Sequence, residues 1–142
     1  MVNFPKPPLV RHITTSKCVL EEDFSCTVKV KGVYYHIEIR QGFIFDGASI
    51  PRIAWRVVGH PYQMPLLVCA LLHDILYASE FFTQSECDWI FLELMDKVGI
   101  NWFKRNTIWS AVKLFGGFVW LKHTKYSINK AKSYMTVKIM DK

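Results

Sequence analysis

His73, Asp74 and Asp88 are ionisable residues at positions where the neighbouring sequence predicts burial. His73 and Asp74 interrupt an otherwise apolar helical segment that runs from Leu66 to Leu76. Asp88 belongs to the core-facing side of the next predicted helix, because apolar residues follow it at helical spacing: Phe91, Leu92 and Met95. A buried charge or imidazole without a partner costs roughly several kcal/mol, so we expect these three groups to meet partners or to share a polar cavity.

A loop with a further carboxylate lies between the predicted strands and the predicted helices. It reads Phe45-Asp46-Gly47-Ala48-Ser49-Ile50-Pro51-Arg52, and junctions of this kind often carry functional residues. Asp46 could present its carboxylate to a ligand, and Ser49 could cap the helix that follows. Arg52 could hold a carboxylate through two parallel hydrogen bonds. These three residues are therefore predicted to bind a ligand.

Two interpretations of this set of residues stay open. In the first, His73, Asp46 and Asp88 are ligands of one divalent metal ion, because imidazole and carboxylate donors suit zinc, manganese, iron or magnesium. Such an ion could activate water for hydrolysis, with Asp74 and Asp88 as the catalytic residues. In the second interpretation the groups form a buried polar network, in which a carboxylate of Asp88 or Asp74 fixes His73.

Hydrophobic periodicity predicts an α+β fold. Residues 13–45 alternate between apolar and polar side chains and are rich in β-branched and aromatic types, which indicates three or four antiparallel strands. Thr83 and Glu86 have the spacing of a capping box. Strands followed by helices indicate a small N-terminal antiparallel sheet packed against about four helices. The period becomes helical over residues 51–58, 64–79, 83–99 and 102–122.

The length of 142 residues suits one domain with two appended segments. We expect an extended proline-rich arm over residues 1–12, an α+β domain over residues 13–125 and a basic extension over residues 126–142. Residues 104–142 contain nine Lys or Arg and one acid, Asp141, a net charge of +8 against +6 for the whole chain. Such a segment suits an acidic partner, either a neighbouring subunit, nucleic acid or a phospholipid surface, although no nucleic-acid-binding motif is present. The alternative is a solvated tail.

Several classes of protein are disfavoured by the sequence. Prolines stand where the apolar region of a secretory signal would run, and no stretch reaches the ~20 apolar residues of a transmembrane segment. No serine-hydrolase elbow, phosphate loop, dinucleotide fingerprint or H-E-x-x-H motif is present. His12 and His123 lie among polar and basic residues and are expected at the surface. No cysteine belongs to a C-x-x-C pair, and free thiols are the expected state of Cys18, Cys26, Cys69 and Cys87. The alternative for Cys18 and Cys26 is that they face each other across a hairpin.

Three short motifs follow one another along the chain. They are Gly42-Phe43-x-x-Asp46-Gly47-Ala48-Ser49-Ile50-Pro51-Arg52, His73-Asp74-x-Leu76-Tyr77 and Asp88-x-x-Phe91. With these motifs the chain resembles, over most of its length, the small phage and prophage proteins catalogued as domain of unknown function 1353. That family often has an Arg a few residues before the final Asp, where this chain has Gln84 and Ser85. The resemblance implies a phage or prophage origin without an established reaction, and it adds Tyr77 to the predicted binding residues.

The function that this reasoning favours is a small virion or tail-associated structural or assembly component. Such a protein would occur in the virion or in the cytoplasm of the host bacterium, and its arm and basic extension would contact other phage proteins. The first alternative is a metal-dependent hydrolase that acts on cell-wall material, and the second is a host-modulating binding protein. The sequence does not decide whether the chain is an enzyme.

Overall fold

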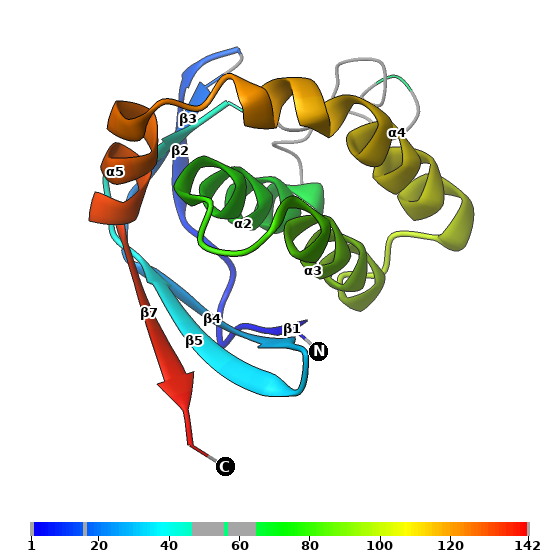
Figure 1. The fold of residues 1–142 in the computed structure, drawn as a ribbon, viewed down its shortest axis with the longest axis horizontal. Helices are drawn as coiled ribbons and strands as arrows, with labels where there is room; N and C mark the ends of the chain where they lie inside the picture. Colours follow the sequence, from blue (N-terminus) through cyan, green and yellow to red (C-terminus); the bar gives the residue numbers. More distant parts are fainter. Residues whose placement is uncertain (1, 16, 47–55, 57–64, 142) are drawn as a thin grey trace.

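A computed structural model describes residues 2–15, 17–46, 56 and 65–141 of the chain. Within these residues four helices accompany two antiparallel sheets, one of four strands and one of three (Figure 1). The predicted α+β class is therefore confirmed. No helix among the described residues has the length and apolar character needed to span a bilayer.

The four-stranded sheet has the order β1-β4-β5-β7. Its central pair, β4 (Phe24–Val30) and β5 (Val33–Ile39), forms a hairpin in which Val30 is opposite Val33. The two connecting residues, Lys31 and Gly32, both have positive φ angles of 50° and 82°. Two residues with positive φ match the right-handed twist of the strands they join, which explains the tight hairpin.

The three-stranded sheet has the order β2-β3-β6 and leads to the Asp46 loop. It consists of β2 (Val10–Thr14), β3 (Lys17–Leu20) and β6 (Ile44–Phe45). Phe45 pairs with Cys18 of β3, so the end of β6 is fixed against the sheet immediately before Asp46. The free thiols of Cys18 and Cys26 belong to strands of different sheets, and all four cysteines are buried and unbonded.

The helix α2 (Leu66–Ser79) is the centre of the molecule, with α3 (Gln84–Lys97) beside it (Figure 1). It is apolar nearly all round, and such a helix is stable only when other elements cover every side. It contacts α3, β6 and α5 (Lys125–Ser133). The fourth helix, α4 (Trp102–Leu121), packs mainly on α3.

The helices predicted over residues 64–79, 83–99 and 102–122 are confirmed as α2, α3 and α4. The capping box at the start of α3 is also confirmed, because the Thr83 side chain accepts a hydrogen bond from the Glu86 amide and the Glu86 carboxylate accepts one from the Thr83 amide. The helix predicted over residues 51–58 lies outside the described residues, apart from Arg56.

Both ends of the chain are part of the four-stranded sheet. Within the predicted arm, β1 (Val2–Asn3) pairs with β4, and Val10 already belongs to β2. Within the predicted basic extension, α5 is followed by β7 (Met135–Met140), which pairs with residues 34–39 of β5. Within the extension Ala131 and Met135 are buried, whereas its described lysines are exposed to solvent. The terminal segments thus occupy the two edges of this sheet.

Candidate functional site

The imidazole of His73 and the carboxylate of Asp88 meet between α2 and α3. His73 Nε2 lies 3.2 Å from Asp88 Oδ1, and the two residues are only 1% and 5% exposed. An ionised carboxylate can only accept a hydrogen bond, so this contact requires the proton of the neutral imidazole on Nε2. The two residues that the sequence marked as anomalous on neighbouring helices are therefore partners.

Tyr77 supplies a second hydrogen bond to the same carboxylate oxygen. It lies four residues after His73, on the same side of α2, and its hydroxyl donates to Asp88 Oδ1 at 2.8 Å. The side chain of Gln84, at the start of α3, also hydrogen-bonds the Tyr77 hydroxyl. The resembled family often has an arginine at about this position before Asp88. In this chain the neutral amide of Gln84 stands there instead.

Aromatic rings enclose this network on two sides. The ring of Phe91 stacks on the His73 imidazole with centroids 4.4 Å apart, and the ring of Trp120 meets Tyr77 edge-on at 5.2 Å. Trp120 belongs to α4, so the network links three helices. We call His73, Tyr77 and Asp88 the buried triad.

The pKa values of the buried triad are displaced by this enclosure. Burial lowers the pKa of His73 below its ordinary value of 6.5, and this effect exceeds the opposing effect of the Asp88 hydrogen bond. Burial, followed by the interaction with Asp88, raises the pKa of the Tyr77 hydroxyl. Both shifts favour the uncharged forms, because the protonated imidazole and the deprotonated hydroxyl would each place a charge in an apolar environment.

A glycine in α4 makes room for the Tyr77 hydroxyl. A Cβ atom at Gly116 would overlap Tyr77 Oη and lie 3.3 Å from Tyr77 Cζ, whereas one at Gly117 would meet nothing within 4 Å. The helix continues through both glycines. Gly116 thus leaves the space on α4 that the Tyr77 hydroxyl occupies.

A cavity of about 540 Å³ opens beside the buried triad. Asp74, which is 8% exposed, lines it from α2, and the exposed Asp46 lines it from the end of β6. Two cationic side chains, Lys17 and Lys130, also line the cavity. The volume lies within the range of small-molecule sites. The described lining residues are Lys17, Gly42, Phe43, Ile44, Phe45, Asp46, Asp74, Tyr77, Ala78, Val119, His123, Tyr126, Ser127, Lys130, Ala131 and Tyr134.

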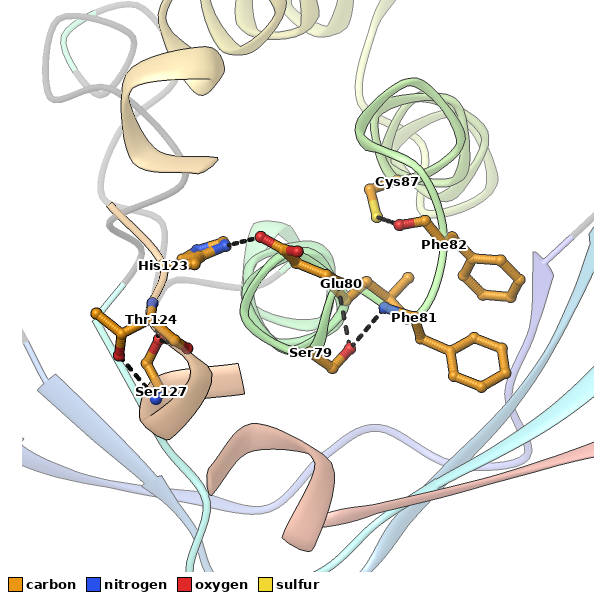
Figure 2. A network of polar contacts seen from close by, with 9 residues as sticks. Ser79, Glu80, Phe81, Phe82, Cys87, His123, Thr124 and Ser127 are labelled. Carbon is orange, nitrogen blue, oxygen red and sulfur yellow. Dashed lines mark hydrogen bonds and ion pairs between the residues drawn. The ribbon is translucent and has the colours of Figure 1, made fainter. Parts of the chain in front are cut away.

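His123 faces this cavity and is held by an acid. Its Nδ1 atom lies 2.9 Å from Glu80 Oε1 (Figure 2), and a carboxylate at one ring nitrogen fixes both the orientation and the tautomer of a histidine. Ser127, also on the cavity wall, is engaged in the capping box of α5 with Thr124 (Figure 2). The expectation of a surface position for His123 is wrong, because its side chain is largely covered.

The residues predicted from the sequence fall into two adjacent groups. His73 and Asp88 are in the buried triad, whereas Asp46 and Asp74 line the cavity, and within the described part of the chain the lining includes neither His73 nor Asp88. Tyr77 belongs to both groups, because it lines the cavity and its hydroxyl donates a hydrogen bond to Asp88. Ser49 and Arg52, the remaining predicted binding residues, lie outside the described residues.

A protein-bound metal ion needs several His, Cys, Asp or Glu side chains close together. Among the described residues no group of three or more such side chains lies close enough together to hold a metal ion. His73 and Asp88 are in contact, but Asp46 is on the cavity side. A metal bound by Asp46, His73 and Asp88 therefore stays a prediction.

The comparisons with known proteins agree with the resemblance of the motifs. A family model described as "Protein of unknown function (DUF1353)" matches residues 18–112 of the chain. No curated protein matches the chain, and no solved structure does so either. The matched range includes Asp46, the buried triad and most of α4.

Proposed function

Because the chain belongs to the DUF1353 family of proteins of unknown function, we propose that it is a structural or assembly component of a bacteriophage, associated with the virion or its tail. The observation that carries this proposal is the enclosure of the buried triad. Its groups connect neighbouring helices, and His73 and Asp88 are almost completely buried.

Catalysis by His73 or Asp88 would require access that the packing denies. A general base must come within hydrogen-bond reach of the proton that it removes, directly or through one water. His73 is 1% exposed, and its ring is stacked against Phe91. A hydrogen-bonded network of this kind instead specifies one arrangement of the surrounding helices. This is the behaviour expected of a scaffold.

The terminal strand β7 offers a surface for assembly. It pairs with β5 on one side, and within the described residues it is the last strand of its sheet. Lys138, Ile139 and Met140 are exposed on it. An edge strand presents backbone groups to which another chain can add a strand. We propose that β7 contacts a neighbouring subunit in this way.

Purified phage particles test the proposal directly. We expect mass spectrometry to find the chain in particles at a constant copy number. A photoreactive crosslinker on Lys138→Cys is expected to capture a particle protein, whereas the same reagent on Lys97→Cys, exposed at the end of α3, is expected to capture none. Absence of the chain from particles and from their assembly intermediates would contradict the proposal.

The cavity supports a second candidate function, a hydrolase that acts on cell-wall material. The supporting observation is that a largely buried carboxylate, Asp74, and a histidine oriented by an acid, His123, line the same cavity. Such groups can serve as general base and general acid.

Purified peptidoglycan distinguishes the two functions. The hydrolase would release reducing ends or free amino groups from it, with or without added zinc or manganese, and Asp74→Asn would abolish the release without unfolding the protein. No release under any of these conditions would remove this candidate and leave the structural role.

A further inference from the structure

Four large apolar side chains on α4 point away from the molecule. They are Phe103, Leu114, Phe118 and Leu121, between 67% and 83% exposed, and we call them the outer stripe. At roughly 100° per residue, the outer stripe faces away from the side of α4 that carries the buried residues. Those buried residues are Ile108, Val112 and Gly116.

The outer stripe contributes little to the fold. The inner side of α4 already packs on α3, so side chains on the other side gain no burial within the molecule. Leu114, Phe118 and Leu121 lie within two turns of one another on this side, whereas polar Thr107 lies between them and Phe103. Exposed apolar side chains grouped in this way mark an interaction site more often than chance exposure. The rise of a helix makes the stripe about 27 Å long from Phe103 to Leu121.

Lysines border the outer stripe on both sides. Lys104 and Lys122 follow one side of it, and Lys113 follows the other, where its ammonium group lies 4.9 Å from the centre of the Trp109 ring. Arg105 differs from these lysines, because it lies near the inner side and pairs with Asp96 at 3.0 Å. The sequence of α4 contains no acidic residue.

We infer that α4 lies flat on an anionic phospholipid membrane surface, with the outer stripe in the boundary between headgroups and acyl chains. An interfacial helix has this construction, in which an apolar face is bordered by lysines whose aliphatic stems extend to the headgroups. Lys104, Lys113 and Lys122 would then contact lipid phosphates. The absence of acids from α4 removes the repulsion that an anionic surface would otherwise exert.

A second copy of this chain fits the same surface less well. Two outer stripes packed against each other would bring the bordering lysines of both copies together, and like charges in an interface oppose association. A protein could bind this surface only if acidic residues on that protein faced the bordering lysines. The charge pattern therefore favours lipid. This inference is independent of the proposed place of the chain in a particle.

Flotation of the full chain with vesicles tests the inference. The probes are vesicles of phosphatidylglycerol mixed with phosphatidylcholine, and vesicles of phosphatidylcholine alone. We expect binding to the anionic vesicles to be at least tenfold stronger and to weaken as salt is raised. Replacing Lys104, Lys113 and Lys122 together by Gln is expected to reduce binding by about 100-fold.

A pair of matched variants isolates the outer stripe. Leu114→Ser with Phe118→Ser is expected to lower binding at least tenfold. Leu9→Ser, at an exposed apolar residue immediately before β2, is expected to leave binding unchanged. Circular dichroism shows that each variant is folded. Equal binding to both vesicle types, no binding to either, or unchanged binding of the double variant would overturn the inference. Sedimentation that shows a dimer abolished by the double variant would also overturn it, in favour of a second copy.

Discussion

His73 Nε2 lies 3.2 Å from Asp88 Oδ1, although 15 residues and the whole turn between α2 and α3 separate the two in the chain. Each residue alone would be a costly group in an apolar interior. Together with the Tyr77 hydroxyl they satisfy one another. The three side chains therefore connect α2 to α3 through specific hydrogen bonds.

Acid is expected to destabilise the protein through His73. Its pKa in the folded state is lowered below the unfolded value of 6.5. As pH falls below that value, the unfolded chain binds a proton that the native protein does not, so the free energy of unfolding decreases. We expect a loss of up to roughly 1 kcal/mol per pH unit below about pH 6, measured by urea unfolding.

The control for this pH dependence is His73→Gln, which can still donate a hydrogen bond to Asp88 but does not titrate. Its free energy of unfolding is expected to fall less steeply between about pH 7.5 and 5. The carboxylate of Glu86, whose pKa is lowered chiefly by a backbone hydrogen bond at Thr83, adds its own loss only below about pH 4.5. Identical slopes for the variant and the natural chain would mean that His73 is free to protonate in the fold.

The two adjacent glycines of α4 are expected to respond in opposite ways to alanine. Gly116→Ala places a methyl group against the Tyr77 hydroxyl and should destabilise the protein by about 1–3 kcal/mol. Gly117→Ala meets open space and should stabilise it by about 0.5–1 kcal/mol, because alanine favours the helix. Thermal unfolding of the two variants compares them, and similar changes in both would show that Tyr77 does not lie against Gly116.

The native thiols are expected to be unreactive while the protein is folded. Burial raises the pKa of Cys18 to about 11 and of Cys26 to about 12, and it also raises the pKa values of Cys69 and Cys87. Since the thiolate is the reactive form, a colorimetric thiol reagent at neutral pH should detect almost none before denaturation and all four afterwards. A thiol that reacts rapidly in the folded state would show that one of these sites opens to solvent.

Features with local causes could be predicted from the sequence. The capping box of Thr83 and Glu86 involves residues three apart, and the core-facing position of Asp88 follows from the spacing of the apolar residues after it. The apolar character of α2 likewise predicted its central burial. In each case the determining interactions lie within one element, where periodicity and capping rules apply.

Features that depend on distant residues could not be predicted. His123 is held by Glu80, 43 residues earlier, and no local pattern distinguishes it from a surface histidine. The requirement for Gly116 depends on where the Tyr77 hydroxyl of another helix lies. The strand β7 pairs with β5, which lies about 100 residues earlier in the chain. The lysines of the C-terminal segment instead suggested a solvated tail.

A double-mutant cycle on His73 and Asp88, measured by urea unfolding at neutral pH, tests the central claim that the buried triad is a structural connection. His73→Leu and Asp88→Leu are each expected to cost about 2–4 kcal/mol, because each removes the hydrogen bond between two buried polar groups. The double variant is expected to lose at least 1 kcal/mol less than the two single losses together. Small, additive losses would contradict the account, since they would place the two side chains apart and in contact with water.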